Sequence, residues 1–239
     1  MTSIVFLDNK LRKKEERKLV NYADKIITPD CYPFELPPKK QISHPSYHSL
    51  AYLHPSRFEP DLQLLVELSI EPEHYIFVSF ARKDWISGRK HNLLQRRKKI
   101  DIVRSLEDHY EVFVDERGFV PEPLEEYTPD IPLTEYNHLL ANAGLALGDD
   151  PLVSSEAGVL GVPWILISDS MAPALEEQEI HYEIGTQVSD IEQAEEIAEM
   201  ILTEEIEPDF EQARRDILED KMDLTDWMIK LVEVYDRRI

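Results

Sequence analysis

The sequence predicts an α/β protein built on a parallel sheet with helices on both faces. Short apolar runs, typical of buried strands, alternate with amphipathic or N-capped helical segments over roughly 140 residues. Strands that alternate with helices favour a parallel sheet covered on both sides. The composition, with 42% hydrophobic and 9% aromatic residues, is that of a globular protein.

The first 48 residues predict a small α/β unit followed by a connecting segment. Ser3–Leu7 has the pattern of a buried strand, residues 9–22 that of a basic, exposed helix, and Lys25–Thr28 that of a second strand ended by Pro29. Residues 30–48 carry four prolines and show no periodicity. We therefore expect a linker or crossing segment there.

A regular alternation follows this segment. We expect helices over residues 60–68, 93–106, 133–143 and 190–202, strands over 75–80, 110–114, 144–147 and 164–167, and a short helix between the last two strands. Residues 205–239 predict two further helices, the last with an apolar packing stripe. The predicted division is therefore a connecting N-terminal part (1–45), a main α/β domain (46–204) and C-terminal helices (205–239).

Charge and cysteine content narrow the environment and the partners. The net charge is −22, divided between +3 for residues 1–60 and −25 for residues 61–239. Such a surface repels nucleic acid and anionic membranes, so we expect neither as a partner. Adaptation to high salt is an alternative to a simple solvated acidic surface. No apolar run is long enough to span a bilayer and no signal-peptide pattern is present, while a single cysteine, Cys31, favours the reducing cytoplasm.

Gly148–Pro163 is the segment most indicative of function. It predicts a turn and a short helix after a strand, where open parallel sheets bind their ligands. Ser154 and Ser155 can offer hydroxyls beside free backbone N–H groups, which predicts that they hold a phosphate of a nucleotide sugar, and Asp149 at the same turn is a further predicted binding residue. Glu156 is placed to accept hydrogen bonds from ribose hydroxyls. The alternative is that Asp149 and Ser154 only cap the helix and that Glu156 is a surface acid.

Basic residues are scarce around this segment. Residues 118–213 contain no Lys or Arg but 23 Asp and Glu. Arg82 and Lys83, in the loop after the strand at 75–80, are the basic residues we expect at the same edge of the sheet, where they could pair with a diphosphate. They could equally be solvated loop charges that balance an acidic body.

No other pattern identifies a reaction or a bound metal. The histidines at 44, 48 and 54 fit no common zinc spacing, so no metal site is expected. No order of Ser, His and Asp indicates a nucleophile system, and no carboxylate pair has the context of a general acid and base. The catalytic residues stay unknown, and no cofactor is expected.

Two motifs resemble a known group of proteins. The pattern Ser155–Pro163 resembles the donor-site signature in the C-terminal half of GT-B proteins, which include UDP-N-acetylglucosamine 2-epimerases and the N-acetylglucosaminyltransferase of cell-wall synthesis. Tyr47–Phe58, with Gly148–Asp150 and Glu156–Pro163, resembles more closely domain-of-unknown-function family 354. That family is archaeal and bacterial, GT-B-like and without an established reaction. The resemblance covers residues 3–203.

The resemblance implies a GT-B-type C-terminal Rossmann-like lobe preceded by a remnant of the N-terminal lobe. It implies a nucleotide-sugar-binding lobe of a glycosyltransferase or sugar epimerase, with a UDP-sugar or a similar compound as substrate rather than a cofactor. Family members carry a complete N-terminal lobe, so a partner subunit from a neighbouring gene is expected to supply it. Ser79 stands where the family usually has an arginine. The alternative is therefore a truncated, non-catalytic member that serves as a binding or structural domain.

Overall fold

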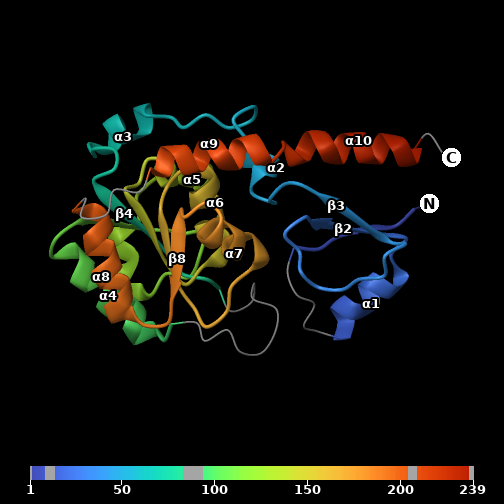
Figure 1. Cartoon of the computed structure of the whole chain (residues 1–239). Coiled ribbons are helices and arrows are strands. Elements are labelled where there is room, and N and C mark those ends of the chain that lie inside the picture. Colours follow the sequence, from blue (N-terminus) through green and yellow to red (C-terminus); the bar gives the residue numbers. More distant parts are fainter. Residues whose placement is uncertain (1, 9–13, 83–93, 204–208, 237–239) are drawn as a thin grey trace.

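The computed structural model describes residues 2–8, 14–82, 94–203 and 209–236. Two parallel sheets form the body, a small one near the N-terminus and a larger one in the centre of the chain (Figure 1). The prediction of an α/β fold with parallel strands is therefore confirmed. None of the helices in the described ranges combines the length and apolar character that crossing a membrane requires.

The small sheet has the strand order β1-β2-β3, with β1 at Ile4–Phe6, β2 at Lys25–Pro29 and β3 at Gln41–His44. Helix α1 (Lys14–Tyr22) connects the first two strands. Residues 30–48, predicted to be a linker or crossing segment, contain strand β3, which the sequence did not predict. That strand has four residues and one aliphatic side chain, which is too little for a periodic signal.

The large sheet has the order β5-β4-β6-β7-β8. All of its neighbouring strands pair in parallel, and Ser79 at the end of β4 lies opposite Gly148 at the end of β6. The strand bounds are Tyr75–Ser79 for β4, Glu111–Val114 for β5, Leu145–Gly148 for β6, Trp164–Ile167 for β7 and Gly185–Val188 for β8.

Helices cover both faces of this sheet, each over its own apolar core. One core lies under α2 (Leu50–Leu53), α3 (Gln63–Leu68), α5 (Tyr136–Leu140), α6 (Pro151–Leu160), α7 (Pro173–Ile180) and α9 (Phe210–Asp220). The other lies under α4 (Arg96–Glu107), α8 (Ile191–Leu202) and the 3-10 helix η1 (Glu122–Tyr127). A second 3-10 turn, η2 (Leu133–Glu135), precedes α5. The sequence did not predict α7, β8 or η1.

The C-terminal segment ties the two sheets together. Its last helix, α10 (Leu224–Asp236), contacts α2, and Figure 1 shows it reaching from the central body toward the small sheet. The ammonium of Lys221, just before α10, forms ion pairs with Asp30 after β2, at 3.1 Å, and with Glu177 on α7, at 2.9 Å. These contacts connect the end of β2 in the small sheet to α7 of the large one.

Candidate functional site

A cleft of about 240 Å³ lies between the two sheets, where the strands of both end. Carboxyl ends of parallel strands and the helix N-termini that follow them are the usual binding edge of such sheets. The described lining residues come from the segment after β1, the end of β2, the residues just before α2, the loop after β4 and the first turns of α6 and α7: Asp8, Pro29, Tyr47, His48, Ser49, Ala81, Asp150, Pro151, Leu152, Ser155, Ala172, Ala174 and Leu175.

The sequence of helix α6 carries residues that favour a helix start at the cleft and a helix end ten residues later. Gly148 has φ 150°, and a Cβ there would lie 1.8 Å from the carbonyl oxygen of Ser79, so only glycine fits between the paired strands. Asp150 is the N-cap and accepts from the N–H of Leu152, with Pro151 in the first helical position. Gly161, at φ 88°, ends the helix in the left-handed conformation.

The two serines of α6 face different ways. The hydroxyl of Ser154 donates to the backbone oxygen of Asp150 at 3.1 Å, so its hydrogen is used within the helix. Ser155 lines the cleft, and its Oγ lies 3.5 Å from that of Ser49 on the crossing segment. Of the two hydroxyls predicted to contact phosphate, only that of Ser155 lies in the cleft.

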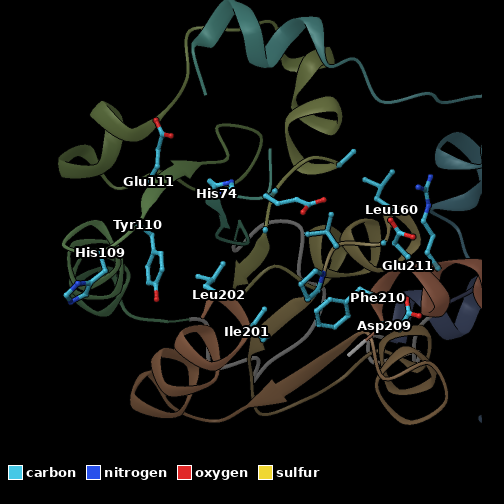
Figure 2. Close-up of a pocket in the computed structure, with 18 residues that line it drawn as sticks. His74, His109, Tyr110, Glu111, Leu160, Ile201, Leu202, Asp209, Phe210 and Glu211 are labelled. Carbon is cyan, nitrogen blue, oxygen red and sulfur yellow. The ribbon is translucent and has the colours of Figure 1, made fainter. Parts of the chain in front are cut away.

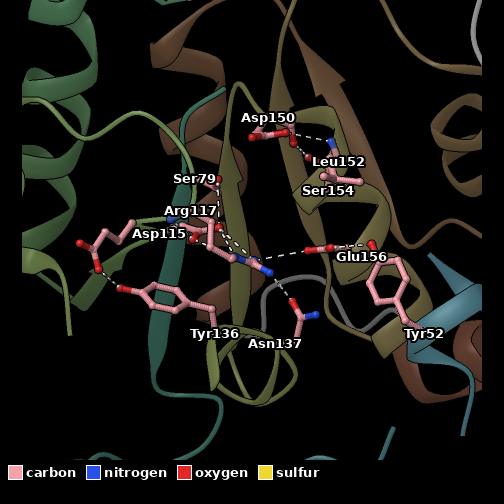
Figure 3. Close-up of polar contacts among 11 residues, drawn as sticks. Tyr52, Ser79, Asp115, Arg117, Tyr136, Asn137, Asp150, Leu152, Ser154 and Glu156 are labelled. Atoms are coloured by element: carbon pink, nitrogen blue, oxygen red, sulfur yellow. Dashed lines mark hydrogen bonds and ion pairs between the residues drawn. The ribbon is translucent and has the colours of Figure 1, made fainter. Parts of the chain in front are cut away.

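Glu156 is buried in a polar cluster beside the cleft (Figure 3). Its Oε1 accepts from the hydroxyl of Tyr52 at 2.7 Å, and its Oε2 forms an ion pair with the guanidinium of Arg117 at 3.3 Å. That ion pair lacks hydrogen-bond geometry, and Oε2 has no hydrogen-bond partner among the described residues. Burial raises the pKa of the Glu156 carboxyl, which Arg117 and Tyr52 oppose. The charge is compensated, but one buried acceptor is left over.

Arg117, the cation of this cluster, was not among the residues predicted from the sequence. Its guanidinium forms an ion pair with Asp115 at 2.9 Å and donates to the side-chain oxygen of Asn137. Asp115 in turn accepts from the hydroxyl of Ser79 at 3.3 Å (Figure 3). The expectation that the cations at this edge come from the loop after β4 was therefore incomplete. A signal existed, since Asp115 and Arg117 directly follow a predicted strand of the same sheet.

The carboxylate of Asp149 is bonded within the protein. Its carboxylate accepts from the backbone N–H groups of Ala81 and Leu94, at 2.9 and 2.7 Å, and from the ammonium of Lys99 at 3.0 Å. Asp149 and Lys99 are both buried. Three donors therefore occupy the carboxylate, which fixes both ends of the loop that follows β4. No pattern in the sequence pointed to Lys99 as the partner of Asp149.

Of the two basic residues predicted in the loop after β4, the described part of the chain includes Arg82. Arg82 is exposed next to Ala81, which lines the cleft, and it takes part in an interaction within the structure. Lys83 lies outside the described residues. Their predicted pairing with a diphosphate stays a prediction.

The three histidines considered for metal binding do not come together. The ring of His44 packs on Trp227 with centroids 5.1 Å apart, Nδ1 of His48 lies 2.9 Å from Asp8, and that of His54 lies 2.9 Å from the hydroxyl of Ser56. His48 and Asp8 both line the cleft, opposite α6.

One group of potential metal ligands does occur in the described residues, formed by Asp30, Cys31 and Glu177. The ammonium of Lys221 already pairs with both carboxylates, and Tyr47 donates to Glu177 at 2.6 Å. Burial raises the pKa of the Cys31 thiol to about 12, which disfavours the thiolate that a metal requires. This cluster therefore acts as a polar link between the end of β2, α7 and the segment before α10.

A larger hollow, of about 790 Å³, lies at the opposite edge of the large sheet (Figure 2). It is lined where strands begin, by His74, Glu111 and Gly144, and by Asp209 and Arg214 around α9. Its size exceeds that of the cleft, but strand starts are not where open parallel sheets bind ligands. The position of the cleft, rather than volume, identifies the candidate site.

Solved structures of GT-B enzymes share this fold. The UDP-N-acetylglucosamine 2-epimerase of Rickettsia bellii aligns with 97% of this chain and 67% of its own at 16% identity and a TM-score of 0.58. The UDP-GlcNAc 2-epimerase of Methanocaldococcus jannaschii aligns with 96% and 69% at 14% identity and 0.58. Os79 from O. sativa, in complex with UDP, aligns with 85% and 52% at 15% identity and 0.53.

These identities establish the fold and no more. The chain spans about two thirds of the epimerases' length and about half of that of Os79. No model of a known protein family and no curated protein matches the sequence. The large sheet and its helices are therefore a GT-B-type Rossmann-like lobe, and the resemblance to domain-of-unknown-function family 354 has no independent support.

Proposed function

We propose that the cleft binds a nucleotide sugar, such as a UDP-sugar, as the donor-side lobe of a GT-B-type glycosyltransferase or sugar epimerase. The observation that carries this proposal is Glu156. It is a buried carboxylate on the helix that starts at the cleft, and its Oε2 lacks a hydrogen-bond partner among the described residues. This oxygen lies 3.3 Å from the Arg117 guanidinium without meeting hydrogen-bond geometry, so it keeps accepting capacity that a ligand hydroxyl would use.

In this proposal a ribose hydroxyl donates to Glu156. Arg117 and Asp115 hold the carboxylate from the side of the sheet, while Tyr52 contacts it from the crossing segment. Because Glu156 is only 4% exposed, the ribose reaches it when the ring of Tyr52, itself 42% exposed, moves aside. Ser155 and Ser49, whose hydroxyls meet in the cleft, then contact the part of the ligand beyond the ribose.

Calorimetric titration tests the ligand class. UDP, UDP-N-acetylglucosamine and their GDP counterparts are titrated into the full chain. We expect measurable binding of at least one of them, and weaker binding of the same nucleotide when its ribose lacks the 2′ and 3′ hydroxyls. Absence of heat with all four nucleotides would remove the proposal.

Catalysis is proposed to need a partner lobe. In the described residues, strand β1 of the small sheet pairs with a neighbour on one side only, so this edge can accept further strands. A chain encoded by a neighbouring gene is the proposed source. Co-expression with such a chain should yield a stable complex. A monomer that recovers no partner and yet turns over a UDP-sugar would contradict this part.

A second candidate function is that of a non-catalytic binding or structural domain. The observation that favours it is the way in which the site's polar groups are already engaged. Ser79 and Arg117 are both bonded to Asp115, and Asp149 is bonded to Lys99. Binding without turnover in the presence of the partner would support this candidate.

A further inference from the structure

The charge of the cleft is unusual for a site that is to hold a diphosphate. The described lining of the cleft carries two acidic side chains, Asp8 and Asp150, and one histidine, His48. It contains no Lys or Arg. Asp8 and His48 pair with each other at 2.9 Å across from α6. The charge that faces α6 at its first turn is therefore that of Asp150 itself.

Asp150 occupies the start of α6 as an anion would. The first turn of a helix binds anions through backbone N–H groups that point away from the helix. Here Pro151 has no N–H, and the N–H of Leu152 donates to the Asp150 carboxylate at 3.0 Å. The N–H of Ser154 donates to the Asp150 carbonyl at 3.1 Å, and the N–H of Val153 lies between these two engaged groups. Asp150 therefore takes two of the three N–H groups of this turn, and a ligand anion at the third, of Val153, would lie beside the Asp150 carboxylate.

Asp150 also differs from the other carboxylates of the site in having no cation. Asp149 pairs with Lys99, and Asp115 and Glu156 pair with Arg117, whereas Asp150 has no ion-pair partner in the part of the chain that the structure describes. Burial raises the pKa of the Asp150 carboxyl to about 6, and Asp115, Asp149 and Glu156 add to this rise. At neutral pH the start of α6 therefore carries a negative charge that the Leu152 N–H stabilises but that no cation of the described residues pairs.

We propose that Asp150 is a specificity-determining residue: its carboxylate takes the anion position of α6, so the cleft selects the uncharged nucleoside or sugar part of a ligand and disfavours phosphate at that helix. The inference rests on the proposed function for the identity of the nucleoside. It predicts that the diphosphate of a nucleotide adds little to the affinity of the wild-type chain.

The test compares three ligands on matched variants of the full chain. Uridine, UDP and inorganic pyrophosphate are titrated into the wild type, Asp150→Ser and Asp150→Asn. The serine variant removes the charge and its bulk, while the asparagine variant removes the charge and keeps an acceptor for Leu152. Asp190→Ser is the control, because Asp190 caps α8 in the same way, accepting from Gln193 at 2.9 Å, and does not line the cleft.

We expect the wild type to bind uridine and UDP with similar affinity. Asp150→Ser should strengthen binding of UDP and pyrophosphate by about tenfold or more, because a like charge next to the phosphate is gone, and should leave uridine unchanged. Asp150→Asn should give a smaller gain of the same sign, and Asp190→Ser none.

Two results would overturn the inference. One is unchanged affinity for both UDP and pyrophosphate in Asp150→Ser and Asp150→Asn, and the other is a wild type that already binds UDP tenfold more tightly than uridine. The proposed function fails separately. If uridine binds no variant while pyrophosphate still gains on removal of Asp150, the charge inference stands and the nucleoside assignment falls.

Discussion

Replacement of Asp150 by Asn should stabilise the folded chain at neutral pH. The carboxyl pKa rises from 3.8 to about 6 on folding, so the charged form is disfavoured in the buried site. A shift of one unit corresponds to about 1.4 kcal/mol, which gives about 3 kcal/mol of destabilisation once the group is ionised in both states. Asn keeps the cap to Leu152 and carries no charge, so the variant should recover most of this amount.

The sign of the pH dependence makes the prediction specific. Because the pKa is raised in the folded state, the contribution of Asp150 to stability is lost as pH rises from 3.8 through 6. The gain of Asp150→Asn should thus be about 3 kcal/mol at pH 7.5 and only about 1 kcal/mol at pH 4.5. Urea unfolding at both pH values measures it, with Asp190→Asn as the control, which should change stability by less than about 1 kcal/mol.

A variant equal to or less stable than the wild type at pH 7.5 would refute the reasoning that Asp150 is an unpaired buried charge. A gain of equal size at both pH values would refute it as well, since the benefit would then come from packing rather than from the charge.

Three further predictions concern other buried groups. Burial lowers the pKa of His44 from 6.5 to about 4, so urea unfolding should show about 3 kcal/mol lost as pH falls through this interval, and His44→Phe should abolish that loss. Lys99→Met leaves Asp149 buried without its cation and should lower the free energy of unfolding by about 3–5 kcal/mol in the same assay. Adding Asp149→Asn should restore most of this loss. If the losses of the two single variants simply add in the double variant, the pairing is contradicted. A Cβ at Gly158 would lie 2.1 Å from Oε1 of Gln178, so Gly158→Ala should lower the melting temperature by several degrees, at about 1–3 kcal/mol; an unchanged melting temperature would show that Gln178 moves freely.

The sequence was sufficient to predict the central strands of the large sheet because they are buried on both faces and therefore almost entirely apolar. β4 and β7 are such strands, with every residue buried. It was insufficient for β3 and β8, which are short edge strands with polar residues and partly exposed positions. Edge strands have one neighbour and weaker burial, so their sequences carry a weaker pattern.

The position of the site was also predictable, but not the state of its side chains. The order of strand, Asp-Pro turn and helix in Gly148–Pro163 placed α6 at the cleft, as the structure shows. The contact of Tyr52 with Glu156 depends on how the crossing segment folds back over α6, which no local pattern encodes. The hydrogen bond from the Leu152 N–H to the Asp150 carboxylate, in contrast, could have been predicted, because Asp before Pro is a common start of a helix.

The most direct test of the proposed function is a calorimetric titration of UDP into the wild type and Glu156→Gln. The substitution preserves shape and an acceptor for Tyr52, and it leaves Arg117 paired with Asp115. A ribose hydroxyl bonded to the carboxylate predicts that UDP binds the wild type and binds the variant about tenfold or more weakly, because a hydrogen bond to a charged acceptor is lost. Equal affinity for both chains, or no binding to either, would contradict the assignment of the cleft as a nucleotide site.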